Sequence, residues 1–121
     1  MNVQEILEAL SSSDIVLETS IIILILEPGR QALRANASLR DGYKLCINEA
    51  TGKGFRSYSY HLLKGDRMVR RWDNAPHWPE LKTFPHHLHL CDEAFVVEST
   101  EAFIDDVLNS ITEIINSGKI D

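Results

Sequence analysis

The fold is decided by residues 33–47, which read Leu33-Arg34-Ala35-Asn36-Ala37-Ser38-Leu39-Arg40-Asp41-Gly42-Tyr43-Lys44-Leu45-Cys46-Ile47. On both sides of Asp41-Gly42, apolar side chains occupy every second position, which is the period of a strand with one buried face. An Asp-Gly pair between two such runs is a hairpin signal. The stretch therefore predicts two antiparallel strands, although the alanines of the first run leave a helix open there.

Runs on either side extend this hairpin into a meander. Phe55 to Leu63 and Arg67 to Asp73 are two β-like runs separated by the tight turn Lys64-Gly65-Asp66. Upstream, β-branched residues dominate from Ile15 to Glu27, and Pro28-Gly29 ends the run. We expect the upstream run to be a long, buried, central strand, and the antiparallel sheet to have about five to six strands.

Each end of the chain carries an amphipathic helical pattern. The N-terminal pattern consists of Val3, Ile6, Leu7 and Leu10. The C-terminal pattern consists of Ile104, Val107, Leu108, Ile111 and Ile115. Asn2 can cap the first helix, Ser99 can cap the second, and Gly118 stands where the second should stop. We expect both helices to pack on the sheet, which gives an α+β fold in a single domain over residues 1–121.

Composition narrows the class of protein. A chain of 121 residues with 44% apolar content is long enough for one core. Its longest purely apolar run, Ile21 to Leu26, is far shorter than the roughly 20 residues that cross a bilayer. The N-terminus has no signal-peptide pattern, so we expect a cytoplasmic protein. Cys46 and Cys91 are too few for a disulfide framework, and we expect both to be reduced thiols.

The charges are segregated along the chain. The net charge is −6, yet residues 30–82 hold eleven of the twelve Lys and Arg residues against five acids. Residues 1–29 contain five acids and no Lys or Arg, and residues 83–121 contain eight acids and one Lys. A basic sheet with acidic flanks agrees with an RNA partner. The same cations could equally serve to solvate the outer face of a sheet and to discourage edge pairing.

The segment from Arg70 to Cys91 is the candidate functional site. It contains four of the five histidines, three of the four prolines and both tryptophans. Proline stiffens the backbone, and imidazole gains or loses a proton near neutral pH. A stiff segment that presents several imidazoles is suited to a binding or catalytic site.

The first interpretation of this segment is acid–base catalysis without a cofactor. One imidazole would take a proton while another gives one, and a guanidinium would stabilise an anionic transition state. Such a set can cleave RNA by attack of the ribose 2′-hydroxyl on the adjacent phosphate. The candidate catalytic residues are His77, His86, His87, His89, Asp73 and Arg71. The candidate substrate-binding residues are Arg70, Tyr58, Tyr60, His61, Asn74 and Lys82. Tyr58 and Tyr60 share one strand face, where their rings could stack on unpaired bases.

Two other interpretations stay open. If residues 86–91 are extended, His87, His89 and Cys91 project to one face and could hold a divalent metal such as zinc, as in a hydrolase. Asp73 or His77 would complete that set. Alternatively, the histidines are hydrogen-bonding residues of a rigid loop, or pack on the tryptophans, and the protein is a non-enzymatic binding module.

Three strings of this region resemble a known family. They are Tyr58-Ser59-Tyr60-His61-Leu62, Arg71-Trp72-Asp73-Asn74-Ala75-Pro76-His77 and Phe84-Pro85-His86-His87-Leu88-His89. Together they resemble the TumE-like toxins of toxin–antitoxin pairs. In that family a second histidine commonly follows the position of His77, and a lysine often stands before that of His89. Here Trp78 and Leu88 occupy those positions, which makes these two residues poor candidates for a family role.

The resemblance implies the toxin component of a type II toxin–antitoxin system. It implies a cognate antitoxin as partner, often a helix-turn-helix protein, and RNA or the ribosome as the target. The activity would be that of an endoribonuclease or another inhibitor of translation. A homodimer is a further expectation, because a sheet with an exposed edge can pair with a second copy.

Overall fold

The computed structural model describes residues 2–118 and shows an antiparallel sheet whose strands follow one another in chain order. The strands are β1 (Val16–Glu27), β2 (Arg30–Leu39), β3 (Tyr43–Gly52), β4 (Phe55–Lys64), β5 (Arg67–Asp73), β6 (His87–Leu90) and β7 (Val96–Glu98). The helices are α1 (Val3–Ser12) and α2 (Ile104–Ser117), and a short 3-10 turn, η1 (Arg40–Gly42), joins β2 to β3. The predicted α+β meander is confirmed. The sheet has seven strands, slightly more than expected, because β7 carries no clear strand pattern.

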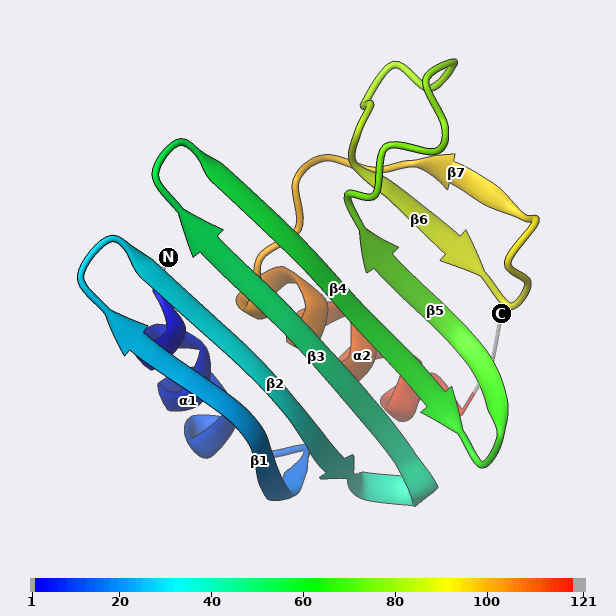
Figure 1. Ribbon diagram of the computed structural model, residues 1–121. Coiled ribbons are helices and arrows are strands. Elements are labelled where there is room, and N and C mark those ends of the chain that lie inside the picture. The colour runs from blue at the N-terminus through cyan, green and yellow to red at the C-terminus, as the bar shows by residue number, and fades with distance from the viewer. Residues whose placement is uncertain (1, 119–121) are drawn as a thin grey trace.

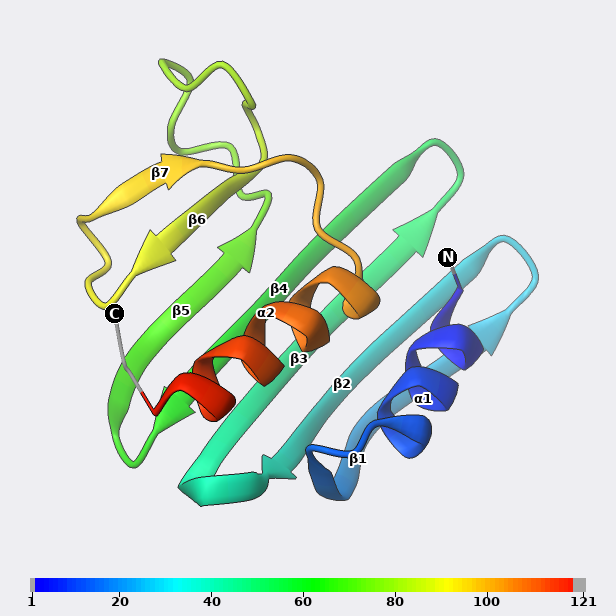
Figure 2. The same ribbon diagram turned by 180° about the vertical axis from the view of Figure 1, so that it is seen from behind.

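Both helices cover one face of the sheet and leave the other face open (Figures 1 and 2). The covered face carries the apolar member of each alternating pair, such as Leu33, Leu45 and Leu62, which are at most 2% exposed. The open face carries the polar positions between them. The period-two pattern therefore places the hydrophobic core between the sheet and the helices.

Helix α1 begins at the predicted cap. The Asn2 side chain accepts a hydrogen bond from the Glu5 N–H at 2.9 Å, and the Glu5 carboxylate accepts one from the Asn2 N–H at 3.0 Å. This reciprocal pair satisfies two backbone donors that the first turn leaves free. The helix then buries Val3, Ile6 and Leu10 against the sheet, as their spacing predicted.

Helix α2 begins later than predicted. Its cap is Phe103, whose N–H donates to the Asp106 carboxylate at 3.3 Å, so the expectation that Ser99 caps it is wrong. The Ser99 N–H instead donates to the Thr83 hydroxyl at 3.0 Å, which ties the chain after β7 to the loop before β6. Gly118 ends the helix as predicted, with φ at 68°. All five residues of the predicted apolar stripe are buried.

Strand β1 corrects a second expectation. It lies at one end of the sheet with β2 as its neighbour, so it is an edge strand and not a central one (Figure 1). Its large aliphatic side chains are exposed rather than buried, with Leu17 at 67% and Ile22 at 54%. An apolar run shows that a strand needs partners, but it does not say where in the sheet they are. No helix within residues 2–118 is long and apolar enough to span a membrane.

Candidate active site

The strand register brings histidine, arginine and aspartate side chains into two neighbouring rows. Arg71 on β5 pairs with His61 on β4 and with His89 on β6. Two residues further along, Asp73 pairs with Ser59 and with His87. Directly paired residues project to the same side of a sheet, so both rows lie on the open face. We call Asp73, Arg71, His87 and His89 the Asp73 cluster.

The turn after β5 holds this geometry in place. The Asp73 carboxylate accepts a hydrogen bond from the Ala75 N–H at 3.0 Å, and the Asn74 amide bridges to the backbone of β4. Its oxygen accepts from the Tyr58 N–H at 3.0 Å, and its nitrogen donates to the Arg56 carbonyl at 2.7 Å. Asp73 and Asn74 therefore have the turn chemistry that their sequence suggests. Asn74 is a structural clamp in this fold.

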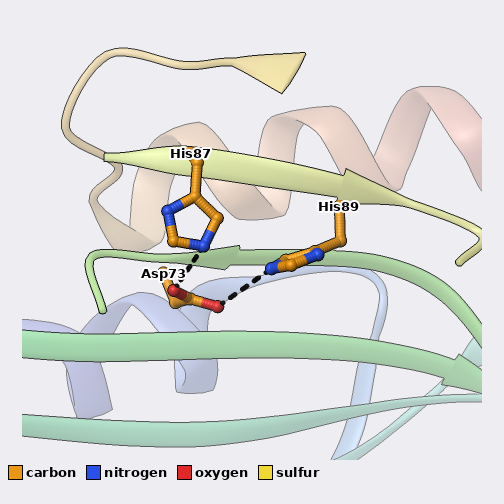
Figure 3. Close-up of side chains that lie close together, drawn as sticks. All are labelled: Asp73, His87 and His89. Atoms are coloured by element: carbon orange, nitrogen blue, oxygen red, sulfur yellow. Dashed lines mark ion pairs between the residues drawn. The ribbon is translucent and has the colours of Figure 1, made fainter. Parts of the chain in front are cut away.

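Asp73 is the centre of the cluster (Figure 3). One carboxylate oxygen lies 2.7 Å from Nε2 of His87. The other accepts a hydrogen bond from Nε of Arg71 at 2.9 Å and lies 3.5 Å from Nε2 of His89. The carboxylate is buried, and the guanidinium of Arg71 supplies the opposite charge.

Backbone carbonyl groups orient both imidazole rings. Nδ1 of His87 donates to the Pro85 carbonyl at 2.9 Å, and Nδ1 of His89 donates to the Glu93 carbonyl at 2.8 Å. A guanidinium nitrogen of Arg71 lies 3.2 Å from Nε2 of His89 and can only donate, so this His89 ring is neutral. Both nitrogens of His87 face acceptors, the Pro85 carbonyl and the Asp73 carboxylate.

Burial and charge act on the two rings beside Arg71. Burial lowers the pKa of His61, and the neighbouring Arg71 charge lowers it further. Burial likewise lowers the pKa of His89; its hydrogen bond to the Glu93 carbonyl opposes this effect, and the Arg71 charge adds to it. Both rings are therefore neutral near pH 7. Nε2 of His61 is buried without a hydrogen-bond partner among the described residues, so it is a free acceptor or donor.

Arg71 is the most exposed member of the Asp73 cluster. Its side chain is 25% exposed, whereas those of Asp73, His87 and His89 are at most 7% exposed. At the rim its guanidinium bonds to the well-exposed carboxylate of Glu93 at 2.6 Å. The Trp78 ring lies edge-on to His89, with the ring centres 6.4 Å apart, so one histidine does pack on a tryptophan. A ligand would reach the cluster through Arg71.

Two of the predicted catalytic histidines lie outside the cluster. Nδ1 of His86 is 2.9 Å from the Tyr58 hydroxyl, which also accepts a hydrogen bond from the Ala102 N–H at 3.2 Å. His77 is exposed in the loop between β5 and β6. The structure therefore brings together four of the six predicted catalytic residues and adds His61 from the predicted binding set.

The predicted base-stacking role of the tyrosines is wrong for this fold. Tyr58 and Tyr60 are 3% and 0% exposed beneath the helices, because their strand positions have the parity of the covered face. Arg70 pairs with Leu62 and Leu90 and so alternates with Arg71 along β5. Lys82 is exposed in the loop, where its backbone N–H donates to the Glu98 carboxylate at 2.9 Å.

Cys91 does not join the two buried histidines. Strand β6 ends at Leu90, and Cys91 has a φ of 62°, which breaks the alternation on which the predicted His87, His89 and Cys91 set depends. Its thiol instead faces the Val69 carbonyl at 3.6 Å. Asp73 takes the third position, since its carboxylate and the two ring nitrogens lie within 4.8 Å of one another. If the protein holds a divalent ion, these three residues are the donor set.

The sequence patterns did not lead us to predict a second buried polar network, which Glu49, Arg56 and Tyr60 form. Glu49 is 5% exposed on β3 and accepts hydrogen bonds from Arg56 and from the Tyr60 hydroxyl on β4. Burial acts to lower the pKa of Arg56, but the hydrogen bonds and charge of Glu49 outweigh it and raise that pKa. Burial and the same carboxylate raise the pKa of Tyr60. The sequence did contain a sign of this network. Glu49 and Arg56 both alternate in phase with the apolar residues of their strands, which places them on the covered face.

Replacing Tyr58 with Phe removes the hydroxyl group that contacts both His86 and the Ala102 N–H. The change leaves the buried Ala102 N–H without its acceptor, so we expect the free energy of unfolding to fall by about 1–3 kcal/mol. Urea denaturation measures this. Tyr43→Phe is the matched control, because the buried Tyr43 contacts Lys64 through its ring. Equal effects of the two changes would show that the Tyr58 hydroxyl contributes nothing specific.

Fold and site together define a small α+β protein with a histidine–arginine–aspartate cluster on the uncovered face of its sheet. The family model described as toxin TumE matches residues 5–115, which include the whole cluster, and the chain belongs to this toxin family. Neither the curated proteins nor the solved structures contain a match to it. The protein is therefore a toxin of a toxin–antitoxin system, and its partner is an antitoxin.

Proposed function

We propose that this toxin is a metal-independent endoribonuclease whose catalytic residues are Arg71 and the two histidines that flank it. The observation that carries the proposal is the cross-strand row in which His61, Arg71 and His89 are paired neighbours on β4, β5 and β6. A guanidinium between two imidazoles provides a phosphate-binding cation with a proton acceptor and a proton donor beside it. The same three residue types are sufficient for the cleavage of RNA.

The reaction consists of one displacement at phosphorus. One neutral imidazole removes the proton of the ribose 2′-hydroxyl, whose oxygen then forms a bond to the adjacent phosphorus. The other ring first takes up a proton from the solvent. The bond from phosphorus to the 5′-oxygen of the next nucleotide breaks, and this ring gives that oxygen its proton, while the first ring later releases the proton of the 2′-hydroxyl to the solvent. Arg71 stabilises the charge on the non-bridging oxygens. The products are a 2′,3′-cyclic phosphate and a 5′-hydroxyl, so all atoms and protons are accounted for.

Asp73 and His87 are positioning residues in this proposal. Asp73 accepts a hydrogen bond from Nε of Arg71 and leaves the outer guanidinium nitrogens for other contacts. One of those nitrogens now contacts Glu93, a well-exposed carboxylate that an incoming phosphate can replace. The carbonyls of Pro85 and Glu93 hold the rings of His87 and His89 against rotation. The groups are therefore preorganised before RNA binds.

The surroundings of the row agree with an RNA substrate. On the same open face, β2 and β3 present the exposed cations Arg34 and Lys44, together with Asn48, whose side chain accepts a hydrogen bond from Arg34 at 2.8 Å. A strand of RNA that crosses these positions would meet cations before it reaches Arg71. An acidic segment of the antitoxin could cover the same surface and so neutralise the toxin.

Replacement of the His89 imidazole tests this proposal directly. Purified protein is incubated with messenger RNA in EDTA, with and without ribosomes, beside His89→Gln and the matched control His77→Gln. We expect the wild type and the control to cleave, and His89→Gln to lose at least about 100-fold of the rate, because acid–base catalysis contributes that much. Intact RNA with the wild type in every condition would exclude a metal-independent nuclease.

A metal-dependent hydrolase is the second candidate. The specific observation is that both buried histidines donate Nδ1 to backbone carbonyls and direct Nε2 toward the Asp73 carboxylate, as metal ligands do. Arg71 weakens this candidate, because its guanidinium already bonds to Asp73 and His89 and would have to withdraw. Elemental analysis of protein purified without a histidine tag separates the candidates, since stoichiometric zinc or manganese would favour the hydrolase.

A further inference from the structure

Strand β1 presents an uncovered apolar edge. Leu17, Ile21, Ile22, Ile23, Leu24 and Leu26 are each between 41% and 67% exposed. They lie on both faces of the strand, since Ile21 pairs with Ala35 of the covered face and Ile23 pairs with Arg34 of the open face. The backbone edge away from β2 has no neighbouring strand among the described residues. Such an edge favours addition of another strand, and soluble proteins usually blunt it with charge or short length.

We propose that two copies of this toxin pair through β1 in an antiparallel, two-fold symmetric dimer. The occupant must supply a strand that is apolar on both of its faces, and a second copy supplies one of the same twelve residues. Symmetric pairs of identical chains are also the commonest form of assembly. This proposal does not rest on the cleavage of RNA.

The sequence of β1 is compatible with pairing to itself. β1 is regular from Ile23 to Glu27, after a bulge between Ile21 and Ile23. If two copies align antiparallel about Leu24, the two Leu24 side chains meet on the covered face, and Ile23 stands opposite Ile25 on the open face. In this alignment the like charges Glu18 and Glu27 do not stand opposite each other. The apolar centre with acids only toward its ends therefore leaves the central pairs free of repulsion.

The exposed surface is of the size that a stable pair needs. Six large side chains that are each about half exposed contribute roughly 500 Å² per copy, so that a pair covers about 1,000 Å², where specific interfaces begin. Backbone hydrogen bonds between the two edges would add to this. Exposed apolar surface of this extent often marks an interaction site.

The flanking charges decide how salt acts on the pair. Residues 2–29 carry five acids and no Lys or Arg, and α1 flanks β1 on the covered face (Figure 2). Two copies therefore bring like charges toward an apolar centre. Salt screens that repulsion, so the dimer should become tighter as the salt concentration rises. A basic antitoxin segment on the same edge would show the opposite salt dependence.

Sedimentation velocity of the purified, untagged toxin over a range of concentrations tests the proposal. We expect a dimer that tightens with salt, and we expect Ile23→Lys to raise its dissociation constant at least about tenfold, because the apolar pairing loses a member and two cations meet near the axis. Phe95→Lys is the matched control, since Phe95 is an aromatic residue, 58% exposed, next to β7. Circular dichroism shows whether each variant is folded.

Each outcome decides the matter. A folded wild-type chain that stays monomeric at all concentrations would overturn the proposal and leave β1 for the antitoxin. Equal weakening by Phe95→Lys and Ile23→Lys would place the interface elsewhere and also overturn it. If Ile23→Lys fails to fold, the wild-type measurement and Leu26→Lys, nearer the end of the strand, still decide.

Discussion

Expression of this toxin alone should arrest growth, and Asp73→Asn should abolish that arrest. The amide keeps the size of the side chain but removes the charge that holds Arg71 and pairs with His87. Removal of one partner from a buried ion pair also costs about 3–5 kcal/mol of unfolding free energy. We therefore expect loss of both activity and stability, measured by colony formation after induction and by urea denaturation of the purified protein.

Two further variants separate these effects for Asp73. Asp66→Asn, in the exposed turn between β4 and β5, is the matched control and should change neither quantity. Arg71→Lys keeps a cation at a side chain that is 25% exposed, so its cost in stability should be small. It loses the planar fork that bonds Asp73 and phosphate together, so toxicity should still fall. Full toxicity of Asp73→Asn would contradict the proposed site.

Glu49→Gln should give the second largest effect. It should lower stability and leave activity unchanged. The change leaves the charge of Arg56 without its buried partner, and the expected loss of unfolding free energy is about 3–5 kcal/mol. Cleavage of RNA per folded molecule should stay close to wild type, because this network lies on the covered face of the sheet. Urea denaturation and the rate of RNA cleavage measure the two quantities.

The control for Glu49 is Glu113→Gln, an exposed carboxylate on α2. The double variant Glu49→Leu with Arg56→Met removes both charges and should recover part of the stability, because a buried pair can often be replaced by apolar side chains. Arg56 keeps its contact with the part-exposed Glu101 in the single variant. Failure of the double variant to recover any stability would show that the loss comes from packing or from Tyr60, and not from the loss of the buried partner of Arg56.

Local patterns in the sequence predicted most of the fold. Strand boundaries followed from the period-two runs and from turns such as Asp41-Gly42, since these signals act over a few residues. The place of β1 did not follow, because the same apolar run fits a central strand and an edge that a partner covers. The start of α2 was also misplaced, since Ser99 has the chemistry of a cap but is bonded to Thr83.

The sequence predicted which segment holds the candidate site, but it did not predict how the side chains of the site are arranged. Composition singled out residues 70–91, and the Asp73 cluster lies there. That His61 stands beside Arg71 depends on the register of β4 against β5, which contains a shift between Leu62 and Leu63. A one-residue shift exchanges the two faces of a strand, so sequence spacing alone could not separate Arg71 from Arg70.

The chemical nature of the RNA ends is the most direct measurement of the central claim. RNA incubated with the purified toxin in EDTA is examined by mass spectrometry of the cleaved fragments. Attack by the 2′-hydroxyl, with His61, Arg71 and His89 as catalytic residues, predicts 2′,3′-cyclic phosphate ends facing 5′-hydroxyl ends. Intact RNA in EDTA, together with 3′-hydroxyl and 5′-phosphate ends when magnesium replaces the EDTA, would contradict this account.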